Sequence, residues 1–105
     1  MKKKIRIYYT TCGDLSEARE ISKKLILQKK AVCVNIIKNV ESFFIDKNSY
    51  ASSNELILII KTDLNKSNIE KLLESIHSYD TPFVVEIKTG MPNKKYLCWA
   101  FDNLL

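Results

Sequence analysis

The order of strand-like and helix-like segments is the feature that most constrains the fold of this 105-residue chain. Segments that alternate apolar and polar residues, or that are rich in β-branched and aromatic residues, predict strands. Apolar residues spaced three and four positions apart predict amphipathic helices. In chain order the pattern predicts a strand at 5–11, a helix at 14–30, strands at 31–45 and 55–62, a helix at 65–77, a strand at 83–89 and a short helix at 96–105.

Local signals support both of the longer helices. Asp14 can accept a hydrogen bond from the amide of Glu17, and the Glu17 carboxylate can reach back, which is a capping-box pattern. Pro82 prevents the second helix from continuing, because proline lacks the amide donor that a helix interior needs. We therefore expect the first helix to begin at Asp14 and the second to end before Pro82.

This strand–helix–strand–strand–helix–strand order predicts an α+β fold, the ferredoxin-like βαββαβ sandwich. We expect one domain over residues 1–105, with an antiparallel four-stranded sheet and both helices on one face. Tyr8 is expected on the other, open face. The segments 31–45 and 55–62 form an extended hairpin with its turn at 46–54. An open, overlong hairpin predicts pairing with another subunit.

The topology places two distant residues at one end of the sheet. The end of the first strand lies beside the start of the fourth, so we expect Cys12 to meet His77, the only histidine. Thiolate and imidazole are ligands that soft metal ions prefer, and a helix N-terminus after Cys12 would lower the pKa of its thiol. Simpler interpretations remain open. Cys12 could be a small packed residue, and His77 could end the second helix as a favourable cation.

Charge and cysteine usage narrow the class of protein. The net charge of +5 could suit a nucleic acid or an anionic membrane. Nearly all the positive residues are lysines, however, and Arg6 and Arg19 are the only arginines, the usual readers of phosphates and guanine edges. We expect no nucleic-acid partner, and no apolar run approaches a membrane span. Cys12, Cys33 and Cys98 are odd in number and widely spaced, which predicts a reducing, cytoplasmic location.

Five blocks of the sequence resemble, in order and spacing, the CutA divalent-cation tolerance family. The blocks are TTCGD (10–14), AVCVNII (31–37), ELILIIKT (55–62), HSYDTPFVVEI (77–87) and YLCWA (96–100). The resemblance runs over nearly the whole chain. It implies a CutA-like ferredoxin-fold subunit in a tight homotrimer, a response to copper and other divalent metal ions, and no catalytic reaction.

The resemblance also implies a set of metal ligands. The copper ligands proposed for the family are the cysteine of the TTC block, the histidine that opens the fourth block and the glutamate after its proline. The first two match Cys12 and His77. The third position is Phe83, which cannot coordinate a metal. Asp80, Glu86 or a neighbouring subunit could supply a further ligand.

Other functions remain open beside a metal-responsive trimer. A trimer similar to the PII signalling proteins could bind a small ligand or a partner protein at subunit clefts, without metal, or serve as a scaffold. An RNA-recognition module shares the βαββαβ order, but its third strand needs aromatic residues, and 55–62 has none. An acylphosphatase-like enzyme would need an arginine in the loop after the first strand, and the residues there, 10–16, contain none.

Overall fold

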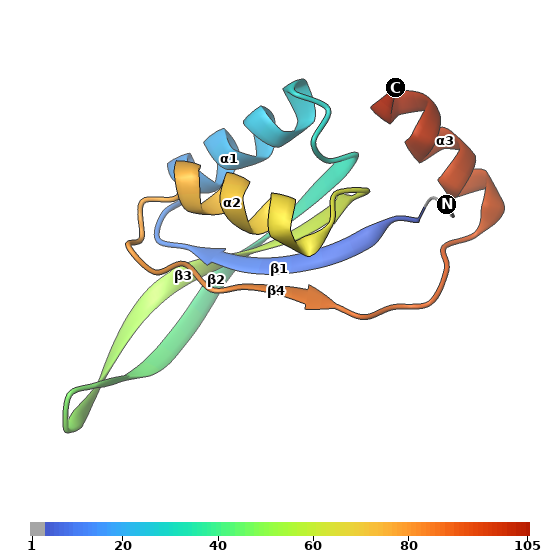
Figure 1. The fold of residues 1–105 in the computed structure, drawn as a ribbon. Coiled ribbons are helices and arrows are strands. Elements are labelled where there is room, and N and C mark those ends of the chain that lie inside the picture. Colours follow the sequence, from blue (N-terminus) through green and yellow to red (C-terminus); the bar gives the residue numbers. More distant parts are fainter. Residues whose placement is uncertain (1–3) are drawn as a thin grey trace.

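The computed structural model describes residues 4–105 and shows an α+β sandwich (Figure 1). Its elements are β1 (Arg6–Cys12), α1 (Leu15–Leu27), β2 (Cys33–Asp46), β3 (Ser49–Thr62), α2 (Lys66–Ile76), β4 (Val84–Ile87) and α3 (Lys94–Leu104). The predicted βαββαβ order, followed by a terminal helix, is confirmed. The expectation of one domain over 1–105 stays a prediction, and residues 1–3 lie outside the described part.

The four strands form one antiparallel sheet in the order β2-β3-β1-β4. β1 is central: Cys12 lies opposite Leu56 of β3, and Thr10 lies opposite Val84 of β4. Helices α1 and α2 lie side by side over one face of this sheet (Figure 1). The end of β1 and the start of β4 are therefore neighbours, as the topology predicted.

The core lies between the sheet and the two helices. Every second residue is buried there from Tyr8 to Cys12 in β1 and from Leu56 to Thr62 in β3, and the helices contribute one apolar stripe each. Its fully or nearly fully buried members include Tyr8, Leu58, Ile60, Ala18, Ile21, Leu25, Ile69 and Leu73. The placement of Tyr8 on the open face is wrong. Its ring is buried, and its hydroxyl donates to the carbonyl of Leu64 at 2.9 Å, which satisfies the polar atom inside the core.

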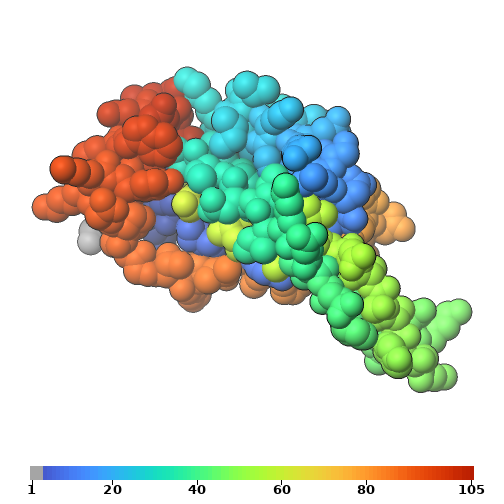
Figure 2. Space-filling model, turned by 180° about the vertical axis from the view of Figure 1, so that it is seen from behind, coloured from blue at the N-terminus to red at the C-terminus, as the bar shows by residue number. Residues whose placement is uncertain are grey.

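The hairpin of β2 and β3 projects well beyond the layered body, so the molecule measures 48 × 26 × 24 Å (Figure 2). The expected turn at 46–54 is wrong, because it is too long. Only Lys47 and Asn48 form it, and 49–54 continue β3 in register with β2. Lys47 takes a φ of 57°, which lets the chain reverse tightly. Ladder pairing with β2 thus overrides the low strand propensity of the Ser and Asn residues.

A shift in register marks the root of this hairpin. Between Ile37 and Val40 the pairing of β2 with β3 slips, and Asn39 in that interval has a φ of 61°. Such bulges bend and twist a strand. The bulge therefore divides the hairpin into a part inside the sheet and a part that projects from it.

Within residues 4–105, none of the three helices has the length and apolar character that a membrane crossing requires.

Truncating the central core should cost much more stability than truncating the surface. Leu58→Ala removes a fully buried side chain and should lower the free energy of unfolding by about 2–5 kcal/mol. Leu27→Ala, at a position that is 81% exposed, should change it by no more than about 0.5 kcal/mol. Urea unfolding at one protein concentration measures both. Equal losses from the two variants would contradict this packing arrangement.

Candidate metal centre

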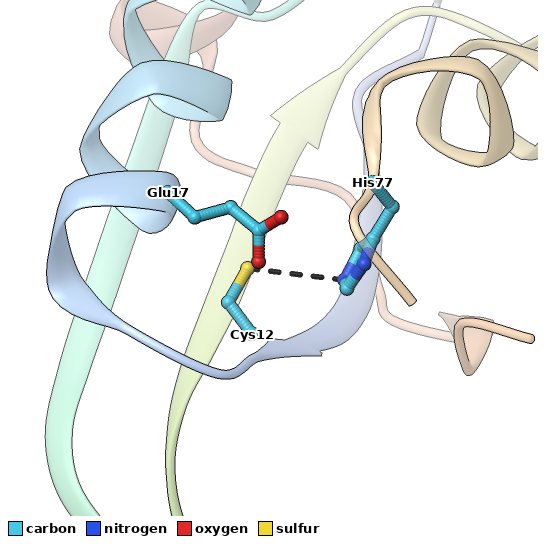
Figure 3. A group of neighbouring side chains, drawn as sticks. All are labelled: Cys12, Glu17 and His77. Carbon is cyan, nitrogen blue, oxygen red and sulfur yellow. Dashed lines mark hydrogen bonds between the residues drawn. The ribbon is translucent and has the colours of Figure 1, made fainter. Parts of the chain in front are cut away.

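Cys12 and His77 meet at the end of β1. Cys12 is the last residue of that strand, and His77 is the residue that ends α2. The Cys12 Sγ lies 3.9 Å from the His77 Nε2 (Figure 3). The predicted juxtaposition is confirmed, whereas the role of the pair as metal ligands stays a prediction.

The imidazole of His77 fastens α2 and its following loop to β1. Its Nδ1 accepts from the Tyr79 amide at 3.0 Å, and its Nε2 lies 2.6 Å from the Thr11 carbonyl oxygen. Because Nδ1 is an acceptor and a carbonyl can only accept, the proton must lie on Nε2. The His77 backbone amide donates to Leu73 and closes the helix. His77 therefore ends α2, as expected, but its ring reaches across to β1.

The thiol of Cys12 is protonated in the free protein. Cys12 is fully buried. Burial, followed by the nearby carboxylates of Glu17, Asp14 and Glu55, raises the pKa of the thiol to about 12. The expectation of a lowered pKa at this helix N-terminus is wrong, because burial and nearby negative charge outweigh the helix dipole.

Glu17 is the residue of this site that the sequence did not reveal. Its amide donates to the Asp14 carboxylate at 2.8 Å, so the forward half of the capping box is confirmed. The return half is wrong, because the Glu17 Oε2 accepts from the Ser78 amide at 2.8 Å, 61 residues away. The only signal in the sequence was an acidic residue one turn into the helix that follows Cys12. Its side chain direction depends on the distant loop that meets it.

Glu17, Cys12 and His77 form a compact group of potential ligands, which we call the donor cluster. One ligand atom from each residue lies within 4.8 Å of the other two. In Figure 3 the Glu17 carboxylate and the imidazole approach the thiol from different elements. The cluster thus joins β1, α1 and the end of α2.

Tyr79 and Glu55 connect the donor cluster to the hairpin. The Tyr79 hydroxyl donates to the Glu55 Oε2 at 2.6 Å. Burial alone would raise the pKa of Glu55, but hydrogen bonds from the side chains of Ser42, Tyr79 and Thr11 lower it overall. Burial, followed by the bond to Glu55, raises the pKa of Tyr79. Glu55 is therefore a carboxylate held ionised at the root of the projecting strands.

The chemistry of the donor cluster fits a divalent metal ion. Sulfur, imidazole nitrogen and carboxylate oxygen are the usual zinc ligands, and a tetrahedral ion would hold sulfur and nitrogen about 3.5 Å apart. The observed 3.9 Å is close to that separation. Among the described residues, the Glu17 Oε1 is buried and has no hydrogen-bond partner. On binding, the thiol would have to lose its proton, and the His77 proton would have to move from Nε2 to Nδ1, with loss of the bonds to the Thr11 carbonyl and from the Tyr79 amide.

Phe83 and the two candidate carboxylates, Glu86 and Asp80, lie outside the donor cluster. Phe83 is 59% exposed and packs edge-on against Tyr9, with ring centroids 6.1 Å apart. Glu86 forms an ion pair with Arg6 at 3.2 Å, and Asp80 is exposed. Neither carboxylate belongs to the donor cluster.

Fold and site together define a class of protein: a small ferredoxin-like subunit with a projecting hairpin and a Cys/His/Glu donor cluster at the end of its central strand. The chain belongs to the CutA1 divalent ion tolerance protein family, whose profile matches residues 6–103. The family is named for tolerance of divalent ions and not for an enzymatic reaction.

Individual relatives agree with this assignment. The divalent-cation tolerance protein CutA of Archaeoglobus fulgidus is 34% identical over 97 residues, which cover 91% of this chain and 94% of that protein. A CutA homolog of Xenopus laevis is 32% identical over 95 residues, but this chain spans only 63% of its length. The crystal structure of CutA1 from Ehrlichia chaffeensis superposes with a TM-score of 0.92 at 29% identity, covering 100% of this chain and 99% of that one.

Labelling of the cysteines should follow their burial and ionisation. At pH 8, four units below a thiol pKa of about 12, roughly one Cys12 thiol in 10⁴ is ionised. Iodoacetamide should therefore modify the exposed Cys98 and leave Cys12 unmodified over the same time. Peptide mass spectrometry resolves the sites, and unfolded protein is the control in which all three react. Equal rates for Cys12 and Cys98 in the folded protein would contradict this geometry.

Tyr79→Phe should destabilise the fold in a pH-dependent way. The lost hydrogen bond to a charged acceptor should cost about 1.5–3 kcal/mol at pH 7. The pKa of Glu55 is lowered from its ordinary 4.5, so its stabilising bonds are present above that pH and are lost as the pH falls through the lower folded-state value. The difference between variant and parent should therefore narrow below pH 4.5 in urea unfolding experiments.

Tyr9→Phe provides the matched control, because it also removes one tyrosine hydroxyl, lies outside the hairpin and keeps the ring that packs against Phe83. This variant should match the parent at every pH. A Tyr79→Phe defect that stayed constant down to pH 3 would show that the ionised state of Glu55 is not involved.

Proposed function

We propose that this chain is the subunit of a homotrimeric divalent-cation tolerance protein that binds a metal ion at Cys12 and His77 and catalyses no reaction. Copper, or another divalent cation, is the ligand that the family resemblance implies. Membership of the CutA1 family supports the general role. The observation that carries the metal proposal is the meeting of the thiol and the imidazole, 3.9 Å apart, across 65 residues of sequence.

Exposed apolar side chains support the association of subunits. The projecting part of the hairpin exposes Phe43, Phe44, Ile45 and Tyr50 by 49–83% of their surface. Large apolar patches on a single subunit mark interaction sites. The hairpin also offers the unpaired outer edge of β2, since β2 is the first strand of the sheet. Three copies are the number that the family resemblance implies.

The free thiols support a reducing, cytoplasmic location. All three cysteines lie in the described part of the chain, and each is a free thiol there. Secreted proteins of this size usually rely on disulfides, whereas cytosolic thiols are kept reduced.

A second function is favoured by a cleft beside the donor cluster. It has a volume of about 520 Å³ and is lined by residues that include Gly13, Lys38, Glu41 and Glu55. Charges of both signs at the hairpin root suit a small polar ligand, as in a PII-like signalling trimer. If the parent protein assembles but binds no metal, binding of a small ligand at this cleft replaces metal binding as the favoured function.

The assembly should depend on the hairpin. Light scattering should give three times the subunit mass of 12.2 kDa for the parent. Ile45→Lys places a charge on a hairpin residue that is 83% exposed in one subunit, and it should lower the mass toward that of the subunit. Leu27→Lys, at an equally exposed position of α1, should leave the assembly intact. A monomeric parent would refute the proposed trimer.

Metal binding should depend on both proposed ligands. In calorimetric titrations with Cu(II) or Zn(II) under anaerobic conditions, Cys12→Ser and His77→Ala should each weaken binding by at least about tenfold. Cys33→Ser is the matched control, because it removes a thiol from β2 outside the donor cluster. If both ligand variants bind metal as the parent does, the assignment of Cys12 and His77 is wrong.

A further inference from the structure

We propose that Glu17 is the third protein ligand of the metal site, so that the site consists of the Cys12 thiolate, the His77 imidazole and the Glu17 carboxylate. This inference rests on the proposed metal binding at Cys12 and His77. It adds a residue from a different element, since Glu17 lies in the first turn of α1.

The first line of support is the direction of the Glu17 side chain. A glutamate at this position of a helix can bond to its own N-cap. Here the carboxylate turns instead toward the loop after α2, where its Oε2 accepts from the Ser78 amide at 2.8 Å. That bond fixes the carboxylate beside the thiol and imidazole, as an outer hydrogen bond typically orients a metal ligand.

The second line of support is the other oxygen of the same carboxylate. The Glu17 Oε1 is buried, and among residues 4–105 it has no hydrogen-bond partner. An unpaired buried polar atom costs about 1–3 kcal/mol, and more when it is charged. Such an atom is retained where a cation or a proton donor completes the site. The Cys12 sulfur and an imidazole nitrogen of His77 lie within 4.8 Å of an oxygen of this carboxylate.

The third line of support is the electrostatic setting of the thiol. Glu17 lies in the cluster, Asp14 caps the helix that follows Cys12, and Glu55 bonds to Tyr79, so carboxylates give the site a negative potential around the buried sulfur. This negative potential attracts a divalent cation, and a bound cation would favour the thiolate over the thiol. Sulfur, nitrogen and oxygen, one of each, form a set that suits a borderline ion such as Zn(II), Co(II) or Cu(II). Three protein ligands leave a fourth position for water or a small ligand.

The test compares Glu17→Gln with the parent and with Glu20→Gln. Glutamine keeps the size of the side chain and an acceptor for the Ser78 amide, but it loses the charge. Glu20 lies on the exposed surface of the same helix. The probes are Zn(II) by competition calorimetry and Co(II) by absorption, because a cobalt–thiolate charge-transfer band reports the sulfur ligand. The trimer mass and circular dichroism of each variant establish that it is folded.

We expect Glu17→Gln to weaken Zn(II) binding by at least about tenfold and to change the visible Co(II) spectrum, with Glu20→Gln like the parent. Glu17→Asp keeps the charge on a shorter side chain, and its affinity for Zn(II) should lie between those of Glu17→Gln and the parent. Without metal, Glu17→Gln should unfold at about the same temperature as the parent, because glutamine keeps an acceptor for the Ser78 amide.

Two results overturn the inference in different ways. If Glu17→Gln binds Zn(II) as the parent does while Cys12→Ser does not, the carboxylate only accepts the thiol proton, and the proposed function stands without Glu17. If the parent binds neither Zn(II) nor Co(II), both this inference and the metal proposal fail.

Discussion

Backbone pairing along both edges of β1 is the interaction on which the rest of this structure depends. β3 and β4 bond to it from opposite sides, and the register sets Cys12 opposite Leu56 and Thr10 opposite Val84. Because α1 begins just after β1 and β4 begins shortly after α2, this register also brings the loops at those junctions together. A slip by one residue would turn the side chain of Cys12 to the opposite face of the sheet and separate it from its neighbours. The ring of His77 then secures the junction through Thr11 and the Tyr79 amide.

Burial and nearby negative charge explain both why the Cys12 thiol is protonated and why the donor cluster attracts a cation. The thiol is held protonated by its burial and by the surrounding carboxylates. Those carboxylates also make the site attractive to a cation, and one of their oxygens has no partner within the described chain. A metal ion in such a place changes the local preference from thiol to thiolate. Protonation in the free protein is therefore consistent with metal binding, provided that the thiol proton can leave.

Tyr79 and Glu55 connect the hairpin to the donor cluster. Glu55 lies in β3 at the level where the register shift begins, opposite Val40, and it accepts from Tyr79. Tyr79 in turn contacts His77 through its amide, with ring centroids 4.7 Å apart. The root of the hairpin and the proposed metal site are thus connected by a short series of hydrogen bonds. The side chains of His77 and Glu55, at the two ends of this series, both depend on the loop of residues 77–83 for their positions.

The sequence by itself determined the order of the elements, the α+β class and the meeting of Cys12 with His77, because periodicity reports local structure and the βαββαβ topology fixes which strand ends are neighbours. It did not determine the length of β3, the burial of Tyr8 or the place of Glu17 in the donor cluster. Only the tertiary structure decided these. Pairing with β2 converts residues 49–54 into strand, the carbonyl of Leu64 makes burial of the Tyr8 hydroxyl tolerable, and the distant Ser78 amide draws Glu17 away from its own helix end. Each outcome depends on a partner far away in the sequence, which local propensity and spacing do not encode.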